Sequence, residues 1–430
     1  MHVVILPWSA FGHIMPFFQF AIALAKVGIE VSFVSTPRNI KRLPKLSSSN
    51  LETQILFVEL PLPTLSGKYP LREGGEAIVD IAAENIQYLK IAYDQLQYPF
   101  KQFIARKMPN WIVVDFCSYW AADIAKEYSI PLLYLSVFSD FPSSIAFRSY
   151  EARSFHPGFY GENASGIKDA ERVARTMAAC RAALVRSCTE FEGEYLNIYR
   201  KILGKPVIPI GLLPPEKPDG KRETLDGIWR KIFEWLDNQE EKSVVFAGFG
   251  SECKLTKDQV YEIAYGLELS ELPFLWALRK PSWAVEDNAD VLPAGFRDRT
   301  SERGKVCIGW APQQEILAHP SIGGSLFHSG WGSVIETLQY GHCLIVLPFI
   351  VDQGVNAKLL VEKGLALEVD RKSDGSFTRN DISKSLRLAM VSLEGKKLRD
   401  RAKEASAIFG DENLHRNYIA SLVEYMRNGV

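Results

Sequence analysis

His13 and Asp115 are residues of this 430-residue sequence whose types suit acid–base chemistry. His13 stands in a turn after the apolar run at residues 2–7, and Asp115 follows the apolar run at residues 111–114. If both runs are neighbouring parallel strands, the two side chains lie at one carboxyl edge of a sheet. A carboxylate that orients an imidazole and stabilises its charged form lets it take a proton from a hydroxyl. The pair predicts a general base; the alternative is an ordinary helix start at His13 with Asp115 as a cap.

A second group begins where an apolar run that ends at Phe327 meets the glycine-rich turn His328-Ser-Gly-Trp-Gly-Ser333. Such a turn, when it leads into a helix, presents backbone N–H groups and the positive helix end to an anion. His328 and Ser333 add side-chain donors. The turn therefore predicts a site for a pyrophosphate.

Further polar and aromatic residues flank this turn in a fixed order. Glu336, one turn into the helix, can accept hydrogen bonds from ribose hydroxyls, and Trp310 and Gln313 can bracket a base. Asp352 and Gln353 follow another apolar run, and an acceptor and an amide there suit sugar hydroxyls. Taken singly, such residues are often core, solvated or turn residues. The ordered set favours a nucleotide-sugar site instead.

These residues need a scaffold of parallel strands, and short apolar runs do alternate with longer amphipathic stretches. Strands are predicted at 2–7, 30–36, 111–116, 131–137, 183–188, 206–211, 243–249, 273–279, 305–310, 325–330 and 343–349. Helices are predicted at 14–27, 121–127, 256–267, 334–340 and 414–426. The pattern predicts an α/β protein with two doubly wound domains, residues 1–212 and 232–410, joined by a proline-rich linker at 213–231.

Composition and charge exclude several classes of protein. The chain has 50 basic and 51 acidic residues, so it offers no global field for nucleic acid. With 47% apolar and 11% aromatic residues it is predicted to fold rather than to stay disordered. The first residues lack the features of a secretion signal, and no apolar run reaches the length of a membrane span. The six scattered cysteines fit a reduced protein, so we expect a cytoplasmic location.

The segment Trp310 to Gln353 resembles the 44-residue signature box of the plant family-1 UDP-dependent glycosyltransferases. The order W-x-P-Q, H-P, H-x-G-W-x-S-x-x-E and D-Q carries the resemblance, which extends over essentially the whole chain. It implies the GT-B fold, with two facing Rossmann-like domains, a cleft between them and the first domain completed by helix 411–430. Gly332 and Cys343 stand where the box usually has asparagine and proline, and Gly332 removes a donor near the phosphates or sugar.

The resemblance also implies roles for individual residues. His13 corresponds to the catalytic base and Asp115 to the carboxylate that orients it. Trp310 would stack on uracil, Gln313 and Glu336 would hold the ribose, and His328 and Ser333 would contact the diphosphate. The donor-binding set comprises Ser251, Trp310, Ala311, Gln313, His328, Trp331, Gly332, Ser333, Glu336, Asp352 and Gln353.

The segments at residues 2–17 and 31–44 resemble the subgroup that extends sugar chains on terpenoid and flavonoid glycosides. The expected reaction is an inverting transfer of glucose or rhamnose to a hydroxyl, with the UDP-sugar as co-substrate and no cofactor. The chain has no Asp-x-Asp pair and no metal-ligand cluster, so we expect metal-independent catalysis, and the family resemblance implies a monomer. A flat apolar acceptor would need an aromatic lining, for which the candidates are Trp8, Phe11, Phe116, Phe138 and Phe141.

Two alternatives belong to other classes. An NAD-dependent oxidoreductase would also be doubly wound, but the only comparable turn, Gly248 to Cys253, lacks the third glycine of the dinucleotide fingerprint. A UDP-sugar-binding protein without turnover would keep the second group of residues, but it would not need both His13 and Asp115.

Overall fold

The computed structural model describes residues 1–65, 71, 73–137, 146–218, 227–281, 283–284 and 291–429. Contacts divide the chain into two compact units, and neither unit is continuous in sequence. The first unit contains Met1–Pro142, Phe155–Leu213 and Glu412–Val430. The second unit contains Ser143–Ser154 and Pro214–Asp411.

The first unit is built on a sheet whose strands run in the order β3-β2-β1-β4-β5-β6-β7, with every pairing parallel. Its strands are β1 (His2–Leu6), β2 (Glu30–Ser35), β3 (Ile55–Glu59), β4 (Trp111–Val114), β5 (Leu132–Ser136), β6 (Ala182–Val185) and β7 (Val207–Pro209). Leu6 pairs with Val114, so the predicted parallel pairing of these two runs is confirmed.

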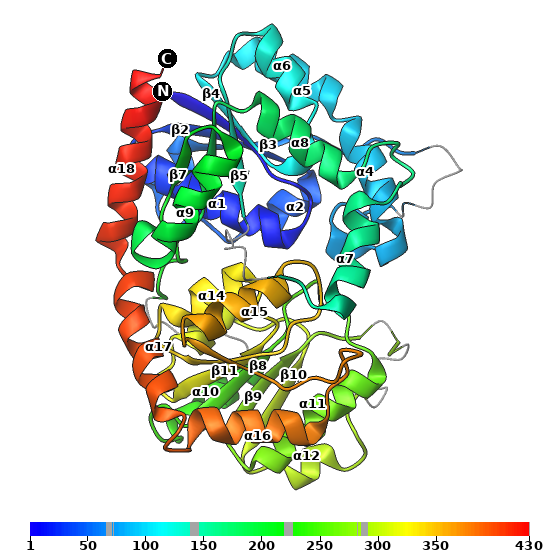
Figure 1. The fold of residues 1–430 in the computed structure, drawn as a ribbon, viewed down its shortest axis with the longest axis vertical. Coiled ribbons are helices and arrows are strands. Elements are labelled where there is room, and N and C mark those ends of the chain that lie inside the picture. The colour runs from blue at the N-terminus through cyan, green and yellow to red at the C-terminus, as the bar shows by residue number, and fades with distance from the viewer. Residues whose placement is uncertain are drawn as a thin grey trace. The chain divides into compact units, whose positions relative to one another are not determined.

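Helices cover both faces of this sheet (Figure 1). They are α1 (Phe11–Lys26), α2 (Pro37–Lys41), α3 (Ser49–Gln54), α4 (Ile86–Asp94), α5 (Gln97–Lys107), α6 (Ala121–Glu127), α8 (Asp169–Ala179), α9 (Thr189–Leu203) and α18 (Glu412–Asn428). Val3 and Ile5 of β1 pack in one core with α1 and α18, and Val4 and Leu6 pack in the other with α4, α5 and α6. Burial on both faces explains why these strands are continuous apolar runs instead of alternating patterns.

The second unit repeats this plan with the strand order β10-β9-β8-β11-β12-β13, again parallel throughout. Its strands are β8 (Val244–Gly248), β9 (Phe274–Leu278), β10 (Gly304–Ile308), β11 (Ile322–Phe327), β12 (Cys343–Val346) and β13 (Ala366–Glu368). Its helices are α10 (Gly227–Asp237), α11 (Lys257–Ser270), α12 (Phe296–Arg299), α13 (Gln313–Leu317), α14 (Trp331–Leu338), α15 (Gln353–Glu362), α16 (Arg379–Met390) and α17 (Lys396–Phe409).

Each sheet has a point where the strand order reverses. In the first sheet it lies between β1 and β4, and in the second between β8 and β11. Parallel α/β sheets bind ligands at the carboxyl ends of the strands beside such a point. Asp115, Ser251 and His328 lie in the loops that follow three of these strands, and His13 lies in the first turn of α1, directly after the loop that follows β1. The expectation of two doubly wound units is confirmed, and the predicted chemistry-bearing residues lie at both reversal points.

The units differ from the predicted domain ranges in two places. Residues 143–154 belong to the second unit, and α10 begins at Gly227 within the range predicted as linker. Helix α7 (Ser149–Tyr160) contributes residues to both units. All six cysteines are free thiols, and five of them are buried. Within the described ranges, no helix is both long enough and apolar enough to span a bilayer.

Candidate active site

His13 and Asp115 form a direct pair in the first unit. The Nδ1 atom of His13, in the first turn of α1, lies 2.7 Å from Oδ2 of Asp115. The backbone N–H groups of Trp8 and Phe116 donate to the same carboxylate at 3.1 and 2.7 Å. Asp115 is only 1% exposed, and these bonds keep its side chain in one orientation. The carboxylate assigns the proton to Nδ1, which makes Nε2 the basic nitrogen of His13.

The aromatic residues predicted to line an acceptor pocket take different positions. Trp8 is 2% exposed and packs edge-on against Tyr93, so its side chain belongs to the core of the first unit. Phe116 lies next to the His13 ring, with centroids 5.7 Å apart, and it is 9% exposed. Phe11 is partly exposed and lies under the guanidinium of Arg42. Phe138 and Phe141 lie outside the described residues.

In the second unit, the turns after β8 and β11 lie against each other. Gly248 pairs with Phe327, so the strands place the Ser251 turn and the His328 turn at the same sheet edge. Gly250 has a positive φ of 70°, and a side chain there would meet the His328 imidazole at 2.8 Å. Burial lowers the pKa of His328 to about 4. The imidazole is therefore neutral near pH 7 and can donate a hydrogen bond without carrying a charge.

Helix α14 begins directly after this turn, as predicted from the sequence. Its first intrahelical bond is donated by Val334 to the Gly330 carbonyl, so the N–H groups of Trp331, Gly332 and Ser333 precede the helical ladder. Trp331 is 4% exposed, which places its side chain in the packing of the unit and limits its predicted role to the backbone. Gly332 and Ser333 are partly exposed. The helix start has the geometry of an anion site.

The residues predicted to hold the nucleoside come together through one hydrogen bond. Gln313 Nε2 donates to Glu336 Oε2 at 2.6 Å, which links the start of α13 to α14. Trp310 is 71% exposed, so a face of its indole is available for a planar ring. Ala311 packs against the core cluster that contains Phe233 and Leu275. A carboxylate and an amide suit the hydroxyls of a nucleoside, and an exposed indole suits its planar base.

The loop that carries Asp352 and Gln353 is fixed from inside. Gln353 is 6% exposed, and its Oε1 accepts from the backbone N–H groups of Phe349 and Ile350 at 2.9 and 3.0 Å. Its side chain therefore shapes the loop in this structure. Asp352 is partly exposed, and its Oδ2 accepts from Asn356 at 2.7 Å.

Two positions that the sequence did not single out hold these loops together. Ser329 Oγ donates to the Gln353 carbonyl at 2.7 Å, and Asn356 donates to the Ser329 carbonyl at 3.1 Å. Ser329 also has a positive φ of 61°. The only signal in the sequence is that Ser329 lies inside the glycine-rich turn and Asn356 one helical turn beyond Asp352. Because the contact joins two loops, spacing alone does not reveal it.

Comparison with known proteins agrees with this geometry. Residues 224–415 match the family model described as UDP-glucoronosyl and UDP-glucosyl transferase. UDP-glycosyltransferase 91A1 of Arabidopsis thaliana is 39% identical, over 99% of this chain and 96% of the relative. Soyasaponin III rhamnosyltransferase of Glycine max is also 39% identical, over 99% of this chain and 95% of the relative.

A solved structure extends the agreement to the fold. UGT73P12 of Glycyrrhiza uralensis superposes with a TM-score of 0.81 at 24% identity, over 100% of this chain and 96% of that chain. The likeness of the two structures confirms the predicted fold class. The 39% identity to the two relatives, over nearly the full length of the chain, confirms the family that the signature box resembles. The chain therefore belongs to the plant UDP-glycosyltransferases and is a sugar-transferring enzyme with the GT-B fold.

Proposed function

We propose that the enzyme transfers glucose or rhamnose from its UDP-sugar to a hydroxyl on a sugar of a terpenoid or flavonoid glycoside, with inversion and without a metal ion. The observation that carries the proposal is the 2.7 Å contact between His13 and Asp115. A neutral imidazole held by a buried carboxylate is suited to remove one proton from an attacking hydroxyl. Rhamnose stands beside glucose because a relative of 39% identity is named as a rhamnosyltransferase.

In the proposed reaction, Nε2 of His13 takes the proton of the acceptor hydroxyl. The oxygen attacks the anomeric carbon from the face opposite UDP, and the bond between that carbon and the UDP oxygen breaks. UDP leaves with the bonding electron pair. Asp115 stabilises the imidazolium that results, because its carboxylate already accepts the Nδ1 proton. One displacement of this kind inverts the configuration.

The second unit would stabilise the departing diphosphate. We assign this role to the start of α14, to Ser251 and Ser333, and to the neutral imidazole of His328. Fixed donors of this kind stabilise developing negative charge without reorganising during the reaction. This set supports catalysis without a metal ion, since the charge on UDP meets protein donors directly.

The remaining donor contacts follow from the positions of the side chains. Trp310 would stack on uracil, Gln313 and Glu336 would hold the ribose, and Asp352 with Gln353 would meet the donor sugar. For the acceptor, Phe116 beside His13 is the aromatic residue best placed to contact the substrate. Phe11 is the second candidate. We expect the protein to act as a monomer in the cytoplasm.

Mass spectrometry of products tests the proposal. The purified enzyme is offered UDP-glucose and UDP-rhamnose with a panel of terpenoid and flavonoid glycosides and with their aglycones. The expected product carries one additional sugar on a glycoside, and His13→Ala reduces its formation at least about 100-fold. EDTA leaves the rate unchanged. Glycosylation of aglycones alone would contradict the proposed glycoside acceptor. Activity that EDTA abolishes and added Mg²⁺ restores would contradict catalysis without a metal ion.

A further inference from the structure

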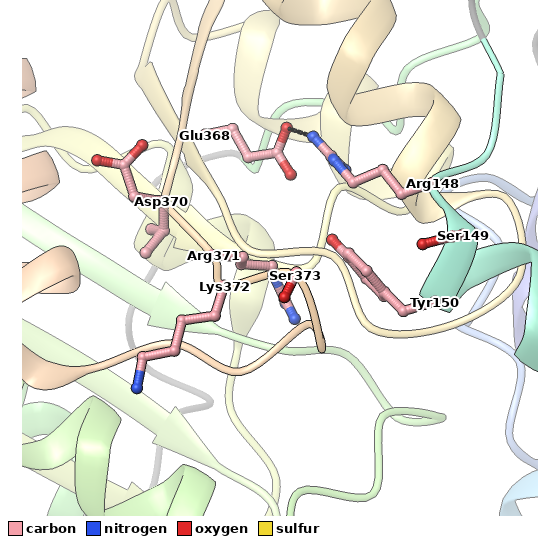
Figure 2. Close-up of a pocket in the computed structure, with 9 residues that line it drawn as sticks. Arg148, Ser149, Tyr150, Glu368, Asp370, Arg371, Lys372 and Ser373 are labelled. Atoms are coloured by element: carbon pink, nitrogen blue, oxygen red, sulfur yellow. Dashed lines mark hydrogen bonds and ion pairs between the residues drawn. The ribbon is translucent and has the colours of Figure 1, made fainter.

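The second unit contains a cavity of about 410 Å³ that the site described above does not use. It lies between the start of α7 and the chain that follows β13 (Figure 2). All of its lining residues belong to the second unit. Because β13 pairs with β12 in parallel, the cavity opens at the same sheet edge as the Asp352 loop. Its volume lies in the range of about 300–1,000 Å³ that small-molecule sites occupy.

Most charged groups around the cavity already have partners. Arg148 donates to Glu151 at 2.8 Å and to Glu368 at 2.5 Å. Asp370 forms an ion pair with Lys384 at 3.1 Å. In Figure 2, Asp370 and Lys372 point away from Tyr150. The charged group near Tyr150 that these ion pairs do not include is the guanidinium of Arg371.

Arg371 has no carboxylate within ion-pair distance in the described part of the chain. Its guanidinium donates to the carbonyl oxygens of Pro348 and Gly375, and it lies over the Phe349 ring at 5.1 Å. The Nε atom is shielded from solvent and has no hydrogen-bond partner among the described residues. A buried donor without an acceptor is costly, so a ligand oxygen there would be favourable.

Tyr150 presents a second donor of the same kind. Its hydroxyl is shielded from solvent and has no hydrogen-bond partner within the described ranges. Figure 2 shows Tyr150 and Ser373 turned toward Arg371, and the guanidinium acts electrostatically on the tyrosine. Burial raises the pKa of Tyr150, so the hydroxyl keeps its proton and donates. A positive guanidinium and a hydroxyl donor that share one cavity match an oxygen anion.

We propose that this cavity binds the carboxylate of a uronic acid, as a sugar residue of one of the two substrates. Arg371 and Tyr150 would receive the carboxylate, while Ser149, Ser373 and Glu368 would meet ring hydroxyls. The location supports a substrate subsite, because Arg371 packs on Phe349, whose N–H donates to Gln353 of the donor-sugar loop. That the bound sugar belongs to a substrate rests on the proposed function, but the binding of a uronic acid to this cavity does not.

A direct binding measurement tests the cavity without any reaction. Methyl β-D-glucuronide and methyl β-D-glucoside, which differ at C6 by a carboxylate against a hydroxymethyl, are titrated into the full-length protein by calorimetry or ligand-observed NMR. The glucuronide is expected to bind at least about ten-fold more tightly, and Tyr150→Phe to weaken it about five- to ten-fold. Equal affinity for the two sugars, or an unchanged affinity in Tyr150→Phe, overturns the proposal.

A matched control lies on the same helix. Tyr160 of α7 is 51% exposed and does not line the cavity, so Tyr160→Phe is expected to bind the glucuronide as the wild type does. Because Tyr150→Phe removes a hydroxyl that has no hydrogen-bond partner in the part of the chain that the structure describes, it tests the ligand contact with little risk to the fold. A loss of affinity in both variants would indicate a general effect and count against the cavity.

Kinetic arms then identify which substrate carries the carboxylate. Rates are compared for UDP-glucuronate against UDP-glucose, and for glucuronide against glucoside acceptors of one aglycone. A preference that Tyr150→Phe reduces about ten-fold assigns the carboxylate to that substrate. Glucuronide binding without turnover of any pair contradicts the proposed function and leaves the cavity supported. Turnover without any carboxylate preference in either arm, together with equal binding of the two sugars, contradicts the cavity alone.

Discussion

At the scale of single residues, Asp115 determines what His13 can do. Both carboxylate oxygens accept hydrogen bonds, from the backbone N–H groups of Trp8 and Phe116 and from the His13 ring. The histidine is therefore held in one tautomer by a partner that is itself held by the backbone. A base built in this way depends on the charge of Asp115 more than on its volume.

Asp115→Asn separates charge from volume. The amide keeps the shape of the carboxylate, but it neither stabilises an imidazolium nor holds His13 in the required tautomer. We expect kcat to fall at least about 100-fold, with KM for the UDP-sugar changed less than about three-fold. Steady-state kinetics at saturating acceptor provide the measurement. A kcat within about three-fold of the wild type would show that His13 works without its carboxylate.

Two buried histidines make the second unit sensitive to acid. Burial lowers the pKa of His328 to about 4 and that of His342 to about 3, whereas an unfolded histidine titrates near 6.5. The unfolded chain therefore binds more protons between these values, and stability falls as the pH drops below about 6.5. At pH 5 each histidine lowers the free energy of unfolding by about 2 kcal/mol relative to pH 8.

Urea unfolding at pH 8 and pH 5 measures this loss. His342 is fully buried, and its Nδ1 lies 3.1 Å from the hydroxyl of Ser325. His342→Gln removes its titration while keeping an amide that can meet this hydroxyl. Between pH 8 and pH 5, the free energy of unfolding of the variant is expected to fall by about 2 kcal/mol less than that of the wild type. An unchanged difference would assign the acid sensitivity to other groups.

At the scale of elements, the last helix stabilises the first unit. Leu422 of α18 is fully buried in the core that α18 shares with α1, and that core includes Phe17. Leu422→Ala is expected to destabilise the protein by about 2–5 kcal/mol through lost burial and the cavity left behind. Glu424→Ala, an exposed position on the same helix, serves as the control and is expected to change stability by less than about 0.5 kcal/mol. Chemical denaturation that ranks the two variants equally would refute the packing role of α18.

The sequence predicted most strands because burial on both faces leaves an unmistakable apolar run. Every predicted strand overlaps one in the two sheets. The strands that were not predicted, β3 and β13, form edges of their sheets, where Ile55–Glu59 and Ala366–Glu368 are partly exposed. Strand β13 has only three residues, so its apolar run is too short to stand out, whereas β3 contains a clear apolar run at residues 55–58 and was missed all the same.

A contact that follows directly from strand order can be predicted from the sequence, whereas contacts made where loops meet cannot. The contact between His13 and Asp115 follows from the pairing of β1 with β4. The inward orientation of Gln353 and the packing of Gly250 on His328 depend on loop conformation. No spacing rule contains that information.

At the scale of the whole molecule, the near-neutral charge indicates how the donor is captured. With 50 basic and 51 acidic residues, the chain has no general attraction for a dianionic nucleotide. We expect KM for the UDP-sugar to change less than about two-fold between about 50 and 300 mM NaCl, because close contacts are screened little. Initial rates across this range test it. A rise of about ten-fold or more would show that long-range attraction contributes.

The discontinuity of both units also affects how the protein is made. The first unit includes Glu412–Val430, so its core is complete only after these residues have left the ribosome. Until then, the face of α1 that α18 will cover stays exposed, although the strands of the first unit left the ribosomal exit tunnel long before. The second unit is completed earlier, at Asp411. During synthesis the second unit therefore has all its residues available first, while the N-terminal part of the first unit waits longest with an apolar face uncovered.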